Sequence, residues 1–172
     1  MEKKVLIVVD MQNDFISGSL GSVQAQAIVP RVQEKIEAYL SRGDQVIFTR
    51  DTHDDTYLQT EEGKHLPVQH CQKGTSGWEI PKELDRNFCL HIDKPNFGWQ
   101  HWQKQNLEDA EMELVGLCTD ICVVSNALLL KTFYPENPIT VDASCCAGVT
   151  PESHRAALET MKMCQIQIIN ME

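Results

Sequence analysis

The chain has 172 residues, with 15 Lys and Arg against 25 Asp and Glu, so its formal net charge is -10. This charge, together with the absence of any Lys- or Arg-dense run, argues against nucleic acid as a partner. No apolar stretch approaches the about 20 residues that cross a bilayer, and residues 1–4 are not followed by a signal-peptide cleavage pattern, so we expect a cytoplasmic protein that does not bind membranes.

Short apolar runs alternate with amphipathic segments along the chain. Lys4–Asp10 is an uninterrupted run rich in Val and Ile, which is typical of a strand buried on both faces of a parallel sheet. Ala25–Leu40 carries apolar residues at helical spacing and is followed by Gly43, a helix-stop signal. Further strands are predicted at Gln45–Thr49, Phe88–Ile92, Met112–Leu117, Ile139–Val141 and Ile166–Ile169, and further helices at Thr119–Thr132 and Pro151–Met163.

This alternation of strand and helix predicts an α/β fold in one domain of residues 1–172. We expect three α/β/α layers around a central, mostly parallel six-stranded sheet. The one long segment without such periodicity, about residues 51–81, is rich in His, Glu, Gly and Thr, and a loop of that length in a compact domain is usually functional. Ligands of such sheets bind beyond the carboxyl ends of the strands, so the residues there are the first candidates for a site.

Chemically capable side chains follow several of these strands. Asp10 ends the first strand, Lys94 follows the third and Cys122 follows the fourth. A carboxylate, an ammonium and a thiol at one sheet edge form a nucleophile site, in which the acid accepts the thiol proton. Because Thr119 and Asp120 are typical of a helix start, Cys122 is predicted in a first helical turn, where the helix dipole lowers a thiol pKa. For Asp10, Lys94 and Cys122, each taken singly, the alternative is a purely structural role.

A metal site is predicted in the long loop. Asp51 and His53 stand two positions apart, so in an extended chain both face one side and can bind the same ion. His70, with either Glu62 or His65, completes a mixed set of His and carboxylate ligands. Such a set suits zinc, manganese or iron. The alternative for His53 is a loop histidine without a metal.

Three motifs resemble those of the isochorismatase-like cysteine hydrolases, and within them the nicotinamidases. The resemblance spans nearly the whole chain. The motifs are Asp10-Met11-Gln12-Asn13-Asp14-Phe15, Lys94-Pro95-Asn96-Phe97-Gly98 and Gly116-Leu117-Cys118-Thr119-Asp120-Ile121-Cys122-Val123.

The resemblance implies a role for each member of the nucleophile site. Asp10 is implied as the general base and later acid, Lys94 as the cation beside it, and Cys122 as the attacking thiolate. A cis peptide bond is implied between Leu117 and Cys118. The backbone N–H groups of Cys118 and Cys122 are implied as the oxyanion hole.

The same resemblance implies one divalent metal ion, zinc in the first place and manganese or iron as alternatives. Its implied ligands are Asp51, His53 and His70, with Glu62 favoured over His65 as the further ligand. The family's metal ligates the pyridine nitrogen of nicotinamide.

Phe15 and Leu20 match residues that line the family's ring pocket. The aromatic residue that often precedes the last metal histidine is missing, because residues 66–69 read Leu-Pro-Val-Gln.

The activity so implied is hydrolysis of nicotinamide to nicotinate and ammonia through a cysteine thioester. One alternative keeps the fold and acts on another small amide, of the maleamate or N-carbamoyl type. Another is a non-enzymatic metal-binding or thiol-sensing module. The expected partner is therefore a small-molecule amide, and the sequence leaves a homo-oligomer open.

Overall fold

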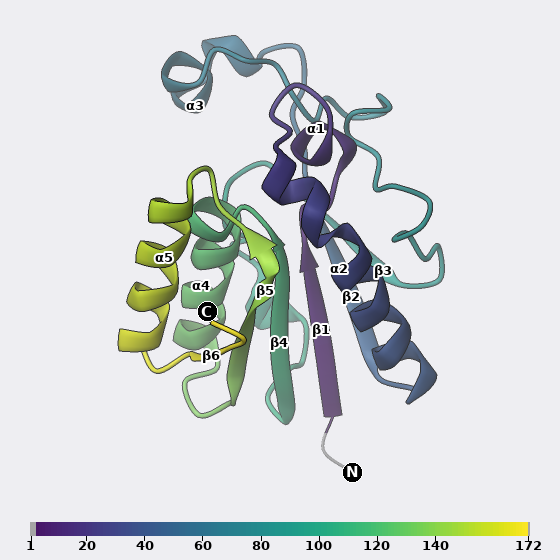
Figure 1. The fold of residues 1–172 in the computed structure, drawn as a ribbon, viewed down its shortest axis with the longest axis vertical. Coiled ribbons are helices and arrows are strands. Elements are labelled where there is room, and N and C mark those ends of the chain that lie inside the picture. Colours follow the sequence, from purple (N-terminus) through teal and green to yellow (C-terminus); the bar gives the residue numbers. More distant parts are fainter. Residues whose placement is uncertain (1–2, 172) are drawn as a thin grey trace.

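Six strands form a single sheet in the computed structural model, which describes residues 3–171 (Figure 1). Their order is β3-β2-β1-β4-β5-β6, and every neighbouring pair is parallel, so the expected six-stranded sheet is confirmed. The strands are β1 (Lys3–Val9), β2 (Gln45–Asp51), β3 (Leu90–Lys94), β4 (Ala110–Leu117), β5 (Ile139–Ala147) and β6 (Gln167–Ile169).

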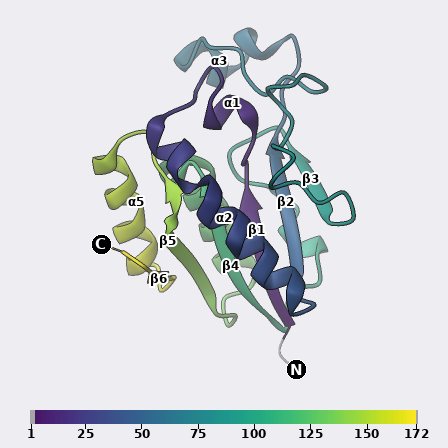
Figure 2. The ribbon, with the colours of Figure 1, turned by 45° about the vertical axis from the view of Figure 1, so that its right-hand side comes forward.

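Helices cover both faces of the sheet, as Figures 1 and 2 show. The long helix α2 (Val23–Ser41) packs on one face, and α4 (Val124–Phe133) with α5 (Pro151–Met163) packs on the other. The expected three layers are therefore confirmed. The remaining helical segments are short: α1 (Asn13–Ile16), α3 (Glu61–His65), two 3-10 turns at Tyr57–Gln59 and Trp102–Lys104, and a π-helix at Thr119–Val123.

Strand β1 lies in the middle of the sheet and contributes to both hydrophobic cores. Val5, Ile7 and Val9 face the core under α4 and α5, whereas Leu6 and Val8 face the core under α2. All five are fully buried. Burial on both faces explains why this strand reads as a continuous apolar run.

All six strands differ from their predicted bounds, and β3 and β5 differ most, whereas the other four differ by one or two residues at an end. Strand β3 begins at Leu90, because Phe88 precedes it and is 77 % exposed, and it continues through the polar pair Asp93 and Lys94. Asp93 is retained in the strand by an ion pair with Arg50 of β2. Strand β5 continues beyond Val141 to Ala147, through polar positions that the apolar pattern did not include.

The predicted helix Thr119–Thr132 is two elements, the π-helix and α4. The helix predicted at Pro151–Met163 has those bounds, and the side chain of Thr150 caps it by accepting a hydrogen bond from the Ser153 N–H.

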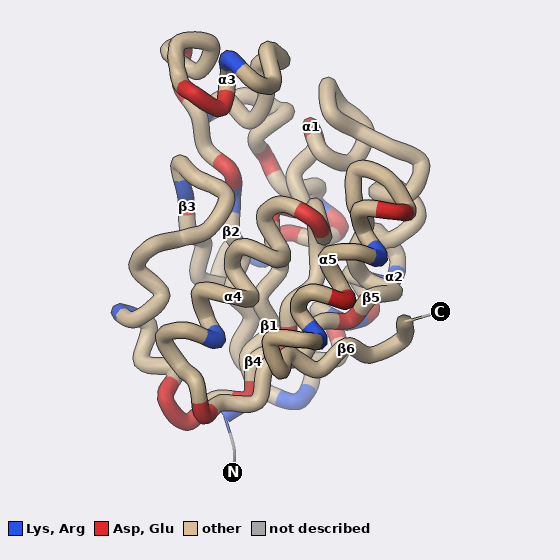
Figure 3. The backbone as a smooth tube through the Cα atoms, turned by 90° about the vertical axis from the view of Figure 1, so that its left-hand side faces the viewer, with Lys and Arg blue, Asp and Glu red and all other residues tan. Residues whose placement is uncertain are grey.

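The charges are spread over the fold. Figure 3 shows basic and acidic positions interspersed along the backbone in that view, without a face that is only basic. No helix among residues 3–171 combines the length and apolar character needed to span a membrane.

Candidate functional site

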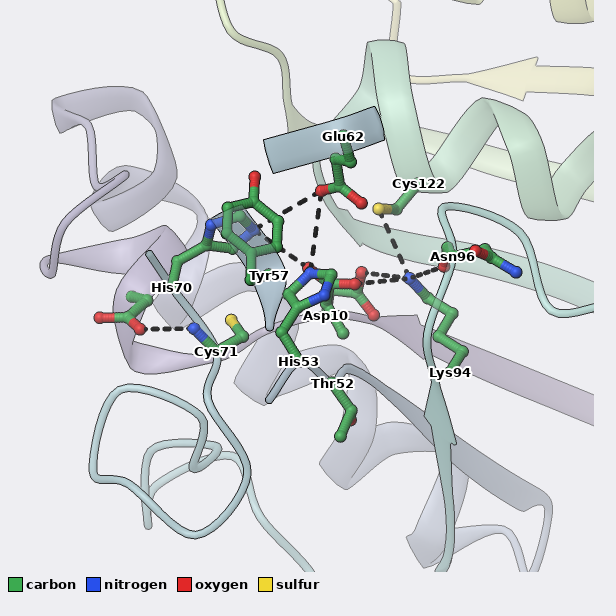
Figure 4. A network of polar contacts seen from close by, with 12 residues as sticks. Asp10, Thr52, His53, Tyr57, Glu62, His70, Cys71, Lys94, Asn96 and Cys122 are labelled. Atoms are coloured by element: carbon green, nitrogen blue, oxygen red, sulfur yellow. Dashed lines mark hydrogen bonds and ion pairs between the residues drawn. The ribbon is translucent and has the colours of Figure 1, made fainter. Parts of the chain in front are cut away.

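The carboxyl ends of the strands bring Asp10, Lys94 and Cys122 together, as Figure 4 shows. Asp10 follows β1, Lys94 ends β3 and Cys122 lies in the π-helix after β4. The Nζ atom of Lys94 is 2.7 Å from Asp10 Oδ2 and 3.5 Å from Cys122 Sγ. Asp10 and Lys94 are fully buried and Cys122 is 5 % exposed. An acid, a cation and a thiol therefore share one enclosed site.

Local contacts fix the orientation of the Asp10 carboxylate. Its backbone has a φ of 48°, and its N–H donates to the carbonyl of Thr49 on the neighbouring strand. The Thr49 hydroxyl donates to Asp10 Oδ1 at 2.7 Å. The other oxygen, Oδ2, meets Lys94 as an ion pair and accepts no hydrogen bond from residues 3–171. Oδ2 is therefore available to accept a proton from the thiol.

Burial controls the protonation of this site. Burial raises the pKa of the Cys122 thiol well above its usual value, Asp10 raises it further, and Lys94 opposes both effects. Burial also raises the pKa of Asp10 against the opposing charge of Lys94. Burial alone would lower the pKa of Lys94, but the charges of Asp10 and Cys122 outweigh it and raise that pKa. The expected lowering of the thiol pKa by a helix start is thus wrong: desolvation dominates, and the thiol needs a base to become a nucleophile.

The turn that carries the nucleophile is built on an unusual backbone. The Leu117–Cys118 peptide bond is cis, and the carbonyl of Cys118 accepts hydrogen bonds from the N–H groups of Ile121 and Val123. Just before it, Gly116 has a φ of 124°, and a Cβ there would lie 2.1 Å from the Val9 carbonyl oxygen. Only glycine fits this close approach of β4 to β1.

The expected metal ligands also meet. Asp51, His53, Glu62 and His70 each offer one ligand atom, and these atoms lie within 4.8 Å of one another. Asp51 Oδ2 is 2.8 Å from His53 Nε2 and 3.3 Å from His70 Nε2. The alternative ligand His65 lies outside the cluster, because its side chain is 77 % exposed and contacts Glu61. The placement therefore favours Glu62.

These residues fit a divalent metal ion. Asp51 Oδ1 is buried, lies 3.9 Å from Lys94 Nζ and accepts no hydrogen bond from residues 3–171, so this oxygen has room for a further cation. His70 Nδ1 bonds the carbonyl of Val68 at 2.7 Å, which fixes the ring with Nε2 toward Asp51, as is usual for a metal-binding histidine. Two imidazoles and two carboxylates are suitable ligands for zinc, manganese or iron.

A cavity of about 450 Å³ opens beside Cys122 and the metal cluster. Phe15 and Leu20 line it as expected, and no Lys or Arg of residues 3–171 does. Its other apolar walls come from distant segments. They include Leu66, Phe97, Ile121 and Val149.

Gln12 lies in the first motif, but the motif did not indicate a role for it. Its Nε2 donates to the carbonyls of Asp51 and Trp78, both at 2.9 Å, and its Oε1 accepts from the Asp51 N–H at 2.8 Å. Gln12 thus holds the backbone of a metal-site residue. Asp14 acts similarly, since its Oδ2 accepts from the N–H of Cys71, next to His70.

Known proteins of similar sequence and fold include several nicotinamidases. The nicotinamidase/pyrazinamidase of Mycobacterium tuberculosis is 26 % identical over 185 residues, covering 96 % of this chain and 98 % of the relative. The solved structure of nicotinamidase from Bacillus subtilis has a TM-score of 0.84 and 27 % identity, covering 96 % of this chain and 98 % of that one. The solved pyrazinamidase of Pyrococcus horikoshii, in complex with zinc, has a TM-score of 0.82 and 26 % identity, covering 98 % and 99 % of the two chains. The family model of the Isochorismatase domain matches residues 4–172, and the chain therefore belongs to the isochorismatase family.

Proposed function

We propose that this protein is an amidohydrolase that converts nicotinamide to nicotinate and ammonia. The observation that carries the proposal is the buried contact of Lys94 with both Asp10 and Cys122, beside a metal-ligand cluster and an apolar cavity. The relatives named as nicotinamidases support the choice of substrate.

Asp10 and Cys122 perform the first half of the reaction. Asp10 Oδ2 accepts the thiol proton, and the thiolate attacks the carboxamide carbon. The backbone N–H groups of Cys118 and Cys122 hold the oxyanion that forms. Asp10 then gives its proton to the departing nitrogen, so ammonia leaves and an acyl thioester on Cys122 remains.

Water completes the cycle. Asp10, again ionised, accepts a proton from water as the water oxygen attacks the thioester carbon. The carbon–sulfur bond breaks, Asp10 returns its proton to the Cys122 sulfur, and the product leaves as nicotinic acid, which releases its proton to water to give nicotinate. Throughout, the charge of Lys94 favours the ionised form of Asp10 between transfers and stabilises the thiolate.

Asp51, His53, Glu62 and His70 would hold the metal ion. When bound, the ion supplies a Lewis acid for the pyridine nitrogen and so anchors the ring. The four side chains orient the substrate in this way and take no part in the proton transfers.

The residues that line the cavity favour nicotinamide over the maleamate and N-carbamoyl amides of the alternative function. Maleamate and N-carbamoyl amino acids carry a carboxylate, which needs a cation or several donors to leave water. The cavity offers no Lys or Arg among residues 3–171, and its walls are largely apolar, with Phe15, Leu20 and Phe97 among them. This lining favours a neutral aromatic amide.

A panel of amides tests the proposal. Ammonia and the acid product are measured with nicotinamide, pyrazinamide, benzamide and maleamate. We expect nicotinamide and pyrazinamide to be hydrolysed, benzamide to react more slowly because it lacks a ring nitrogen, and maleamate to be unreactive. Hydrolysis of maleamate without hydrolysis of nicotinamide would overturn the substrate assignment, and no ammonia from any amide would favour a non-enzymatic module.

A further inference from the structure

A second cavity, of about 530 Å³, lies between α2, β5 and α5. It shares no lining residue with the cavity beside Cys122. Its polar walls include Arg31 of α2, Ser144 of β5, and His154 and Arg155 of α5. The proposed hydrolysis uses none of these residues, so the cavity needs a separate explanation.

The two arginines of this cavity differ from the other arginines of the chain. The chain has five arginines, at positions 31, 42, 50, 86 and 155. Arg42, Arg50 and Arg86 each pair with a carboxylate. Arg31 and Arg155 form no ion pair within residues 3–171, and Arg31 donates only to the carbonyl of Ser144, at 3.3 Å. Arg31 and Arg155 are exposed positions without an acidic partner among residues 3–171, and both line this one cavity, where their charges give an external anion a place to bind.

Other groups of the cavity are compatible with an anion. His154 bonds Thr119 Oγ1 through Nδ1 at 2.6 Å, which leaves its Nε2 available for a ligand. The nearby carboxylate of Asp142 is 2 % exposed. Its oxygens already accept hydrogen bonds from Lys35, Ser144 and Asn170, and it shares the charge of Lys35 with Glu113.

We propose that this cavity binds a small organic phosphomonoester, with the phosphate between Arg31 and Arg155. A phosphate dianion balances two guanidinium charges, and the planar guanidinium fork matches phosphate oxygens in two-point hydrogen bonding. The volume lies in the range of about 300–1,000 Å³ that holds ligands much larger than inorganic phosphate. Leu158 and Met171 give the cavity an apolar wall for the organic part.

Calorimetric titration of the full chain with adenosine monophosphate tests this site, with inorganic phosphate as the second probe. The variant R31Q/R155Q removes both guanidinium groups. The control K82Q/K104Q removes the same net charge from two lysines that do not line the cavity and form no ion pair within residues 3–171. Circular dichroism checks that both variants are folded.

We expect the nucleotide to bind one-to-one and more tightly than inorganic phosphate. Its affinity should fall by at least about tenfold in R31Q/R155Q and stay unchanged in K82Q/K104Q. Absence of nucleotide binding at millimolar concentration, equal affinity in R31Q/R155Q, or equal affinity for both probes would overturn the proposal. None of these results bears on the hydrolysis of nicotinamide, because the two cavities are separate.

Discussion

The Lys94 ammonium is fully buried and lies 2.7 Å from the Asp10 carboxylate, itself fully buried. Removing two charges from water is costly, and such a pair rarely adds to stability compared with apolar residues of similar volume. A chemical role explains the pair better: the charge of Lys94 lowers the pKa of the neighbouring carboxylate and so limits the rise that burial causes.

Replacement of Lys94 by methionine should therefore affect both stability and activity. Asp10 would stay buried without its partner, and the cost of leaving it charged or of protonating it should lower the free energy of unfolding by at most about 3–5 kcal/mol. The pKa of Asp10 would rise further, which leaves the base protonated and lowers turnover. Urea unfolding and ammonia release measure the two effects. The double variant D10N/K94M should recover part of the stability and none of the activity; wild-type stability and turnover in K94M would contradict this role of Lys94.

The pKa of Cys122 predicts how its alkylation depends on pH. Because burial raises that pKa, the thiolate is scarce at neutral pH in the metal-free protein. The rate of iodoacetamide labelling at Cys122, followed by peptide mass spectrometry, should still be rising steeply above about pH 10, where the rate of an ordinary thiol with a pKa of about 8.5 has levelled off. A rate that levels off below pH 8 would show that the helix start outweighs burial.

Glu62 and His65 form a matched pair for the metal site, because both lie in the short helix α3 and only Glu62 faces the cluster. Glu62→Gln should weaken zinc binding by at least about tenfold, whereas His65→Gln should leave it unchanged. Zinc affinity is measured by competition with a chelating dye. The reverse pattern would make His65 the ligand.

Gln12 should influence the metal site through the backbone of Asp51. Gln12→Ala leaves the N–H and carbonyl of Asp51 and the carbonyl of Trp78 without this partner. Each buried group left without a hydrogen-bond partner lowers the free energy of unfolding by about 1–3 kcal/mol. We expect zinc affinity to fall as well. Gln26→Ala, at an exposed position of α2, is the control. Unchanged zinc affinity in Gln12→Ala would limit Gln12 to a role outside the metal site.

The sequence predicted the fold well where burial alone determines the pattern. Strand β1 is apolar on both faces and was recognised nearly to its ends. Strand β5 was predicted too short because Asp142 and Ser144 interrupt its apolar run. Their place in the strand depends on Lys35, which reaches Asp142 from α2 and is 107 positions distant in sequence. A pairing between residues so far apart cannot be predicted from the local sequence around either of them.

The site was predicted to a similar extent. The strand ends indicated Asp10, Lys94 and Cys122, and the spacing of Asp51 and His53 indicated the metal cluster, which the structure brings together. The choice between Glu62 and His65 depends on how a five-residue helix is oriented, and the thiol pKa depends on enclosure by the whole fold. Neither property is local to a motif.

Ammonia release from nicotinamide by the metal-loaded protein and by its Cys122→Ala variant tests the central claim most directly. Cys145→Ala is the control, because Cys145 is also buried but does not line the cavity beside Cys122. We expect release by the wild type and by Cys145→Ala, and none above background by Cys122→Ala, with all three proteins folded. Equal release by Cys122→Ala, or none by the wild type, would contradict a cysteine-dependent nicotinamide hydrolase.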